Sequence, residues 1–434
     1  MNRPIARNEN RRTIGEGFSS RRNSLNFIRL VLALIVLYDH SVGLGGFGYI
    51  WTLNDSSVGT VAVYGFFGIS GYLIAGSMAR NRPGRYLWQR FLRIFPGFWV
   101  CLIVTAFFFG IIEWLTHPIP HCGLSCYFDA GDSPVGYLYR NWLLPNPSLH
   151  QWTIAGTPRG VPYGVAWNGS MWTLCYEFLC YLMLLGLALA GYLRSRLVTL
   201  GLAIALWALI ALITLNPSLD SQISVSHGPM VMYFLKFSAV FLGGTVMFLY
   251  QDRIPDSGWL ALACVGVYVA SLWLPNGFLP HGAERNPLYF FTASDLLTPL
   301  VAYPLLWLGI HLPFQRVASR NDYSYGVYIY AYPVSQLLAS ENAQRWGYPA
   351  YLALCIAATA PFALASWWLV EKRALSLKKV ELKPVAAWVH RDGRRGEPQP
   401  TSDGTDQAGY SDAERATGYP PGSTQAVIPV PDTE

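Results

Sequence analysis

Residues 27–45 read FIRLVLALIVLYDHSVGLG, an apolar run that contains three ionisable residues, Arg29, Asp39 and His40. A helix needs about 20 mostly apolar residues to cross the hydrocarbon core of a bilayer, and this run has that length. It is too long for the apolar core of a cleaved export signal, which would also not contain Asp39 and His40. We therefore expect a retained membrane-spanning helix.

The rest of the chain has the same apolar character. Of its 434 residues, 52% are hydrophobic and only 13% are charged, whereas about 25% are charged in a typical soluble domain. Lipid tolerates only helices or closed barrels, and barrel strands would be short and alternating instead of continuously apolar. The sequence therefore predicts an all-α polytopic membrane protein, a bundle of about ten transmembrane helices. We expect these helices at residues 27–45, 58–79, 94–116, 172–191, 197–215, 230–250, 258–275, 295–311, 323–340 and 348–370.

The distribution of Lys and Arg sets the orientation of these helices. Basic residues accumulate in cytoplasmic loops, and here they are concentrated in the end segments and in every second connection. Those segments include Arg21, Arg22, Arg82, Arg85, Arg194, Arg253, Arg316, Lys372 and Lys383. The alternate connections hold Arg140, Arg159, Arg285 and Arg345. Both termini are therefore predicted to be cytoplasmic, in a multi-pass protein of the bacterial inner membrane.

The chain divides into three regions by composition. Residues 1–23 form a basic cytoplasmic segment, residues 24–375 form the membrane domain, and residues 384–434 are rich in Pro, Gly, Ser and Asp. The last region lacks apolar periodicity and is predicted to be a disordered cytoplasmic tail. The net charge of +6 is sorted by membrane side and not gathered on one face, so the expected partner is the lipid bilayer and not nucleic acid.

A long outer loop is expected at about residues 117–171. It contains Cys122 and Cys126, with His117 and His121 beside them. A bacterial periplasm permits a disulfide between the two cysteines. A metal site is the alternative, although zinc ligands normally have a tighter spacing, and we expect no metal. The many aromatic and proline residues of this loop make it the expected place where an acceptor substrate is chosen.

Arg29 and His40 are the first pair of residues that could carry chemistry. They are eleven residues apart, about three helical turns or about 16 Å along the axis, and so project from nearly the same face. Arg29 lies near the cytoplasmic surface and His40 lies deeper. Such a pair could hold the phosphates of a long anionic ligand and place its reactive end beside an imidazole, as the thioester of coenzyme A requires. The alternative is an interfacial arginine and a histidine that bonds to a neighbouring helix.

Glu177 and Lys236 enter the membrane from the outer side, each about 8 Å below the boundary by helical rise, and His40 is expected at a similar level. Ionisable residues at such a depth are functional candidates by default. In the functional interpretation, His40 acts as a general base and Asp39 or Glu177 orients or charges it. In the structural alternative, Glu177 and Lys236 form a buried ion pair that stabilises the bundle.

Further residues complete the candidate site. Arg90 and Arg93 precede the third helix, and their guanidinium groups match phosphate oxygens, although topology alone would also place arginines there. Ser70 lies among small residues that allow close helix packing. We predict that Ser70, Tyr176 and Lys236 line the interior chamber.

Six stretches in this order resemble the membrane acyltransferase family 3, which includes O-antigen, exopolysaccharide and Nod-factor O-acetyltransferases. They are residues 26–29 (NFIR) with 38–40 (YDH), 65–74 (GFFGISGYLI), 90–96 (RFLRIFP), 172–177 (WTLCYE), 323–328 (YSYGVY) and 370–372 (VEK). The resemblance implies a ten-helix bundle that moves an acyl group, usually acetyl, from cytoplasmic acyl-CoA to a hydroxyl of a carbohydrate or glycolipid acceptor. Acyl-CoA, expected to be acetyl-CoA, is a co-substrate, and no permanently bound cofactor is expected.

The resemblance also assigns roles to individual residues. His40 would be catalytic with Arg29 essential beside it, Arg90 and Arg93 would bind the donor, and Glu177 would belong to the catalytic chamber. This chain departs from many members at Ala331, where they have a histidine, so His40 would act without a second imidazole.

Two mechanisms and one other class of protein remain open. The His40 imidazole either deprotonates the acceptor hydroxyl or transiently accepts the acyl group itself. The alternative class is a transporter or flippase of a sugar or lipid-linked substrate, against which the lack of a visible internal repeat counts.

Overall fold

The computed structural model describes residues 12–18, 23–48, 52–53, 56–144, 150–164, 166–273, 293–317 and 321–379. Internal contacts divide the chain into residues 1–382 and 383–434. The second unit, which holds the predicted tail, and the first eleven residues lie outside the described residues. Within the described ranges the protein is nearly all helical, as predicted, with one small antiparallel pair, β1 (Thr52–Leu53) and β2 (Ser56–Ser57).

The described residues contain sixteen α-helices. They are α1 (Ile14–Gly17), α2 (Leu25–Leu44), α3 (Val58–Arg80), α4 (Pro83–Val104), α5 (Gly110–Thr116), α6 (Leu124–Asp129), α7 (Pro134–Asn141), α8 (Trp172–Leu189), α9 (Arg196–Leu215), α10 (Pro217–Leu249), α11 (Gly258–Leu272), α12 (Ala293–Leu296), α13 (Ala302–His311), α14 (Ser324–Ser340), α15 (Tyr348–Ala365) and α16 (Lys372–Ser376). Short π-helical turns, at 105–109 and 366–371, join α4 to α5 and α15 to α16.

Seven helical stretches among the described residues are long and apolar enough to cross a membrane. They are Leu25–Leu44, Val58–Arg80, Pro83–Thr116, Trp172–Leu189, Arg196–Leu215, Met230–Leu249 and Tyr348–Ser376. Each overlaps a stretch predicted from hydropathy, so the prediction of a polytopic all-α membrane protein is confirmed. The count of ten stays a prediction, because α11, α13 and α14 are shorter than a membrane span. The cytoplasmic location of both termini also stays a prediction.

The expected single helix at residues 295–311 is wrong in detail. The chain there forms α12, a 3-10 turn at 298–301 and then α13. Pro299 lies in the turn, and proline has no backbone N–H to donate and clashes with the preceding turn of an α-helix. The interruption therefore has a local cause.

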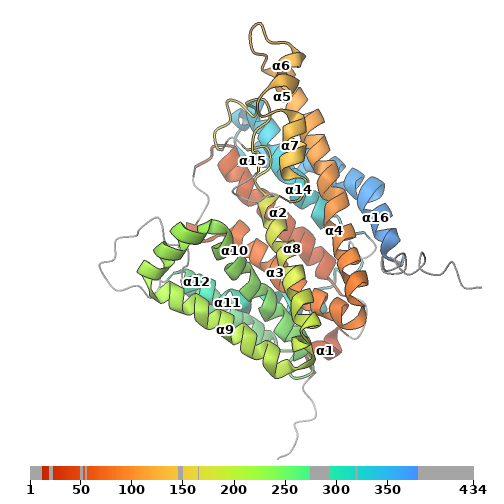
Figure 1. Ribbon diagram of the computed structural model, residues 1–434, viewed down its shortest axis with the longest axis vertical. Helices are drawn as coiled ribbons and strands as arrows, with labels where there is room; N and C mark the ends of the chain where they lie inside the picture. Colours follow the sequence, from red (N-terminus) through yellow and green to blue (C-terminus); the bar gives the residue numbers. More distant parts are fainter. Residues whose placement is uncertain are drawn as a thin grey trace, which may run out of the picture. The chain divides into compact units, whose positions relative to one another are not determined.

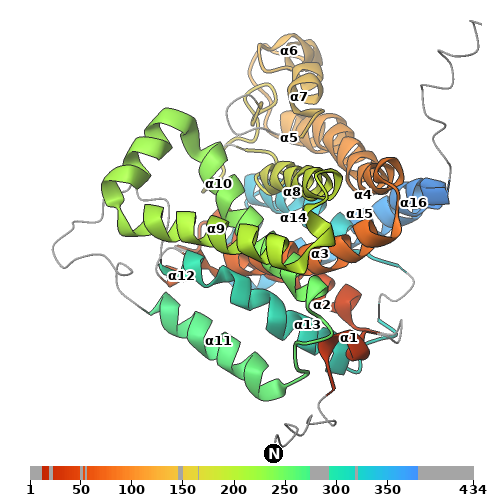
Figure 2. The ribbon, with the colours of Figure 1, turned by 60° about the horizontal axis from the view of Figure 1, so that its bottom comes forward.

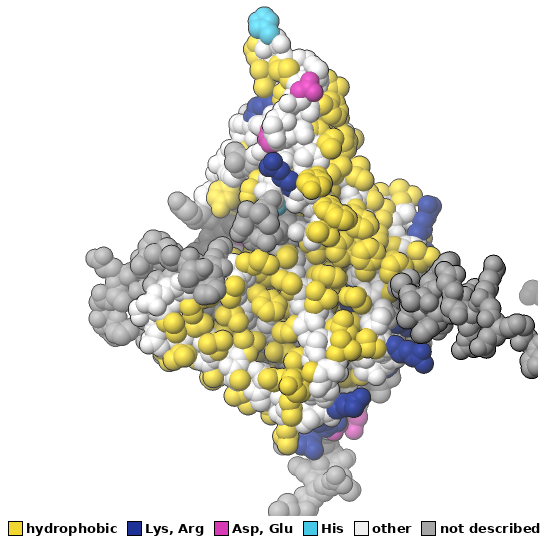
Figure 3. Space-filling view, viewed as in Figure 1, with side chains coloured by type: hydrophobic (Ala, Val, Ile, Leu, Met, Phe, Trp, Pro, Cys, Tyr) yellow, Lys and Arg dark blue, Asp and Glu magenta, His cyan; other side chains and the backbone are white. Residues whose placement is uncertain are grey.

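Helices α2, α3 and α14 lie in the interior of the bundle, whereas α9 and α11 lie at its edge (Figures 1 and 2). Almost every residue of α14 is buried, and α2 packs against both α3 and α14. In contrast, most of α9 is exposed. Hydrophobic side chains cover much of the face shown in Figure 3, as expected of a surface that contacts hydrocarbon.

Helices α3 and α10 cross at glycines that allow their backbones to touch. A Cβ atom added to Gly71 would lie 2.0 Å from the carbonyl oxygen of Phe241, and one added to Gly244 would lie 2.1 Å from that of Gly68. Contacts this short cannot be relieved by rotating a side chain. Small residues bring membrane helices together through van der Waals packing, so these glycines fix the α3–α10 distance.

The outer loop is fastened to the bundle by side-chain hydrogen bonds to the backbone. Asn168 Nδ2 donates to the Ile329 carbonyl at 2.8 Å, and Gln336 Nε2 donates to the carbonyls of Gly164 at 2.7 Å and Ala166 at 3.0 Å. Ile329 and Gln336 both belong to α14. The loop residues Gly164, Ala166 and Asn168 are therefore held against α14.

The cysteines of the outer loop are paired. Cys122 and Cys126 form a disulfide, which takes up the two sulfur ligands that the alternative metal site would need. The described part of the chain contains no group of three or more His, Cys, Asp or Glu side chains arranged to hold a metal ion.

Replacing Gly244 with alanine tests the α3–α10 crossing. We expect Gly244→Ala to lower the free energy of unfolding by about 1–3 kcal/mol, the usual effect of overpacking. Thermal unfolding of the purified protein in detergent measures the change. Gly266→Ala on α11 is the matched control, because a Cβ there meets no atom within 4 Å. Equal melting temperatures for the two variants would contradict the tight crossing.

Candidate functional site

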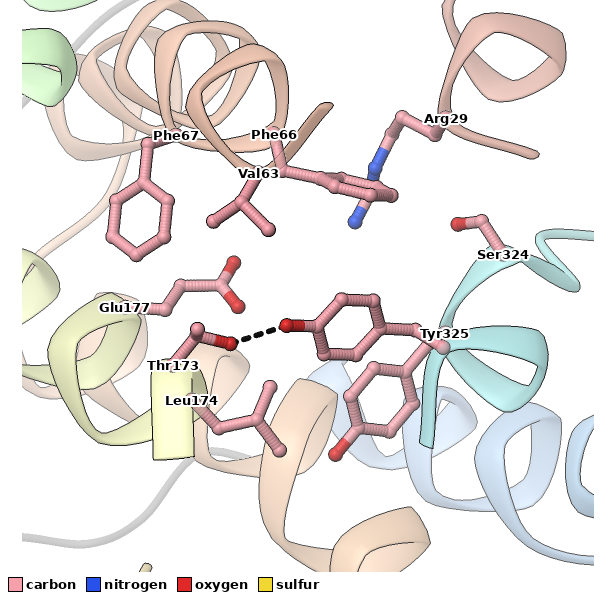
Figure 4. Close-up of a pocket in the computed structure, with 10 residues that line it drawn as sticks. Arg29, Val63, Phe66, Phe67, Thr173, Leu174, Glu177, Ser324 and Tyr325 are labelled. Atoms are coloured by element: carbon pink, nitrogen blue, oxygen red, sulfur yellow. Dashed lines mark hydrogen bonds between the residues drawn. The ribbon is translucent and has the colours of Figure 1, made fainter. Parts of the chain in front are cut away.

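Three neighbouring cavities run through the bundle between α2, α3, α8 and α14. The Arg29 cavity is lined by Arg29, Phe66, Glu177 and Tyr325, among others (Figure 4). The His40 cavity is lined by Asp39, His40, Tyr64 and Ser170, among others. The outer cavity is lined by His40, Trp152, Tyr163 and Tyr332, among others.

The cavities share walls and so form a series. Val63, Thr173 and Tyr328 line both the Arg29 cavity and the His40 cavity. At this junction the hydroxyls of Thr173 and Tyr328 are hydrogen-bonded to each other, the bond drawn dashed in Figure 4. Asp39 and His40 line both the His40 cavity and the outer cavity. Arg29 and His40 therefore face one interior route at different depths.

The imidazole of His40 lies where the His40 cavity meets the outer cavity. Its Nδ1 atom is buried and has no hydrogen-bond partner among the described residues. The ring stands edge-on to Tyr332, with the ring centroids 5.1 Å apart. An imidazole with a free nitrogen can accept a proton or attack a carbonyl carbon, so the geometry leaves both predicted roles open.

Asp39 is bonded to α3 and not to His40. Its Oδ1 accepts a hydrogen bond from the Gly59 backbone N–H at 3.0 Å, and its Oδ2 accepts one from the Ser57 hydroxyl at 3.1 Å. A Cβ on Gly59 would lie 2.5 Å from this carboxylate. Asp39 thus caps the N-terminus of α3, where a negative charge is stabilised. Its only relation to the adjacent His40 among the described contacts is the nearness of its negative charge.

Glu177 lies one helical turn deeper than we expected. It lines the Arg29 cavity (Figure 4). It accepts hydrogen bonds from the hydroxyls of Tyr181 and, at 3.5 Å, Ser70. The prediction that it is level with His40 is wrong, because the first turn of α8 is already at the level of the His40 cavity. Thr173, one turn before Glu177, lines both of these cavities.

The alternative ion pair between Glu177 and Lys236 is also wrong. Lys236 Nζ pairs with Asp295 at 3.0 Å, and Asp295 accepts a hydrogen bond from the Tyr64 hydroxyl at 2.8 Å. Because Tyr64 lines the His40 cavity, the Lys236–Asp295 pair supports the cavity wall from behind.

The three residues predicted to line the chamber lie in or behind its walls. Ser70, Tyr176 and Lys236 are not lining residues of the three cavities described here. The Tyr176 side chain is fully buried, with its ring 5.5 Å from those of Trp172 and Phe237. Ser70 reaches the Arg29 cavity only through its bond to Glu177.

Two of the three predicted donor-binding arginines converge on a carboxylate that sequence reasoning missed. Asp322 Oδ2 lies 2.9 Å from Arg29 Nη1 and 2.5 Å from Arg93 Nη2, and Arg93 also lies 3.8 Å from Glu371. Burial alone would raise the pKa of Asp322, but the two guanidinium groups and Ser324 hold that pKa well below its usual range. Asp322 is therefore ionised and bridges α2 to α4.

Arg90 stands apart from this ion-pair network. Its guanidinium lies over the Tyr181 ring, 5.7 Å from the centroid, and its buried Nε has no hydrogen-bond partner among the described residues. Burial, together with the charges of Arg93 and Arg90, lowers the pKa of Lys378 to about 8. This end of the bundle is therefore rich in positive charge, and Arg90 has donor groups available for an anion.

In this apolar helical bundle, adjoining interior cavities bring Arg29 and the imidazole of His40 into one series. The chain belongs to the acyltransferase 3 family, whose sequence model, described as an acyltransferase domain, matches residues 22–368. The protein is therefore a membrane acyltransferase.

Two curated proteins are similar to it over most of their length. An O-acetyl transferase of Shigella phage Sf6 is 30% identical over 83% of this chain and 98% of its own. Nodulation protein 10 of Rhizobium leguminosarum bv. viciae is 25% identical over 84% of this chain and 96% of its own. No solved structure matches the chain significantly.

The Asp322 ion pairs can be tested by removing the carboxylate charge. Asp322→Asn leaves two buried arginines facing each other, and breaking a buried pair in this way costs about 3–5 kcal/mol. Because the pKa of Asp322 is depressed, its stabilisation is fully present above the unfolded pKa of about 4 and is lost as the pH falls below it. We expect the melting temperature of Asp322→Asn to lie below that of the wild type throughout the range from about pH 5 to 8. A difference that disappeared within this range would contradict the ion-pair role.

Proposed function

We propose that this protein is an O-acetyltransferase of the bacterial inner membrane. It takes an acetyl group from cytoplasmic acetyl-CoA and transfers it to a hydroxyl of a carbohydrate or glycolipid acceptor on the outer side. The series of adjoining cavities between Arg29 and His40 carries this proposal. The name of the phage relative, an O-acetyl transferase, supports the choice of group.

The donor enters from the end of the bundle that holds the arginines. The phosphates of acetyl-CoA bind Arg90, whose guanidinium forms no ion pair with another described residue, and Arg29 and Arg93 add positive charge beside it. From there an extended pantetheine arm follows the cavities toward the imidazole. The distance from Arg29 to His40, about 16 Å by helical rise, suits a long and narrow donor.

At His40 the acceptor hydroxyl loses its proton to the imidazole as its oxygen attacks the thioester carbonyl. The carbon–sulfur bond then breaks, and the imidazolium returns the proton to the leaving thiolate. In the covalent alternative, the imidazole nitrogen attacks the thioester carbonyl and the carbon–sulfur bond breaks, which leaves an acetyl-imidazolium and the coenzyme A thiolate. The acceptor oxygen then takes the acetyl group from the imidazole, and the proton of the acceptor hydroxyl passes to the thiolate. Both routes use the same bound thioester and require His40 to be neutral at the start.

Replacing His40 tests the chemistry. We expect His40→Ala to lose more than 99% of transfer of radiolabel from acetyl-CoA to extracted polysaccharide, since general-base catalysis contributes about 10²–10⁴-fold. The melting temperature should stay close to that of the wild type. His311→Ala is the matched control, because His311 stacks on Trp307 at the end of α13, outside the three cavities. Near-normal turnover by purified His40→Ala would overturn the mechanism, and label that only crosses vesicles would indicate a transporter.

Arg90 and Arg93 should respond differently to substitution. We expect Arg90→Gln to raise the KM for acetyl-CoA about tenfold, the effect of one lost charge-assisted bond, with little change in melting temperature. Arg93→Gln should lower the melting temperature markedly, because it leaves Asp322 and Glu371 with fewer partners. Kinetics and thermal unfolding of both variants in nanodiscs provide the comparison. A normal donor KM for Arg90→Gln would remove Arg90 from the donor site.

A further inference from the structure

The outer cavity has a chemical character different from that of the Arg29 cavity. Its wall carries five aromatic side chains, those of Trp152, Tyr163, Trp172, Tyr233 and Tyr332. Its ionisable lining residues besides the tyrosines are Asp39 and His40, and among the described residues no Lys or Arg lines it. A phosphate would meet no cation there. The cavity therefore favours an uncharged ligand with apolar faces.

Two of these rings are accessible to a ligand. Trp152 is 39% exposed and Tyr163 is 63% exposed, and both belong to the outer loop. Trp172 and Tyr233 pack against each other in the opposite wall, with ring centroids 4.5 Å apart. Aromatic rings that are both apolar and partly wet are the side chains that proteins use at recognition surfaces.

The position of the loop is fixed before a ligand arrives. Gln336 holds the carbonyls of Gly164 and Ala166, and Asn141 Nδ2 donates to the Gln151 carbonyl at 3.0 Å. Gly169 allows the loop to approach Tyr332 closely, since a Cβ there would lie 2.6 Å from the tyrosine ring. Binding pockets are usually formed in advance in this way, with few polar groups that set orientation.

We propose that the outer cavity is the acceptor subsite and that it binds one pyranose ring of the carbohydrate. The C–H faces of the sugar pack on the exposed rings of Trp152 and Tyr163, and the sugar hydroxyls project from the edge of the ring toward His40. The Asp39 oxygens accept hydrogen bonds from Ser57 and Gly59 at the start of α3, whereas His40 Nδ1 has no hydrogen-bond partner among the described residues, so the imidazole is the group placed to take a hydroxyl proton. This inference rests on the proposed function and identifies the place and the kind of ligand that function requires.

Ligand-observed NMR on the wild-type protein in nanodiscs tests the subsite without any transfer reaction. The probes are methyl pyranosides of the common hexoses, and mannitol is the control ligand because it has similar hydroxyls but no ring face. We expect saturation transfer to a pyranoside and not to mannitol. Trp152→Ala and Tyr163→Ala should each weaken pyranoside binding about three- to tenfold, as the loss of one aromatic contact predicts.

Two matched variants separate ring contact from folding. Trp152→Phe keeps a ring at the same position and should retain pyranoside binding to within about twofold. Tyr139→Ala removes an aromatic side chain that is 78% exposed on α7, in the same outer loop and outside the cavity, and should leave binding unchanged.

Other outcomes would overturn the inference. Equal binding by Trp152→Ala, Tyr163→Ala and the wild type would do so, as would mannitol binding as well as the pyranosides, or no pyranoside binding at all. If label transfer by the wild type and its loss in His40→Ala were still observed, the proposed function would survive that failure. Conversely, pyranoside binding that depends on Trp152 in a protein with no acetyl transfer would retain the sugar subsite and refute the O-acetyltransferase.

Discussion

Asp322 places one carboxylate between two arginines that belong to different helices, Arg29 on α2 and Arg93 on α4. It also accepts hydrogen bonds from the backbone and hydroxyl of Ser324 at the start of α14. Helices α2, α4 and α14 are therefore tied together at one point, and two of them, α2 and α14, line the interior cavities. Arg29 is held at this point by Asp322. The eleven-residue separation between Arg29 and His40 therefore determines how far the imidazole lies from the arginines, and the cavities lie along that length of α2.

Hydropathy was sufficient to find the helices but not their interruptions or relative depths. Runs such as 58–79 and 172–191 match α3 and α8 closely because length and apolar content are properties of the segment alone. The break at Pro299 and the extension of α10 back to Pro217 depend on local backbone chemistry and packing. Glu177 was placed too near His40 because depth was counted from an assumed membrane boundary, whereas α8 begins at Trp172 already inside the wall of the His40 cavity.

The sequence also did not predict which buried charges pair with each other. Predicting an ion pair between two helices requires knowing that those helices are in contact. Lys236 was paired with Glu177 on grounds of depth, but it contacts Asp295, which had been read as the beginning of a helix. Asp322 was passed over as part of a connecting loop. A signal was present, because an Asp two residues before Ser324 at a helix start commonly bonds the following backbone N–H groups. The faces of α2, in contrast, were predictable from spacing alone, and both Arg29 and His40 line the interior.

An open passage through a bilayer would let ions leak across it and dissipate the gradients that a cell maintains. Where the Arg29 cavity meets the His40 cavity, the Thr173 and Tyr328 hydroxyls bond to each other and the Phe66 ring lies 5.8 Å from that of Tyr328. This plug consists of side chains, so turning one tyrosine about its own torsions widens the passage while the helices stay in place. If the proposed thioester donor filled this gap, its arm would itself block the passage of hydrated metal ions during turnover, as the two side chains do before it.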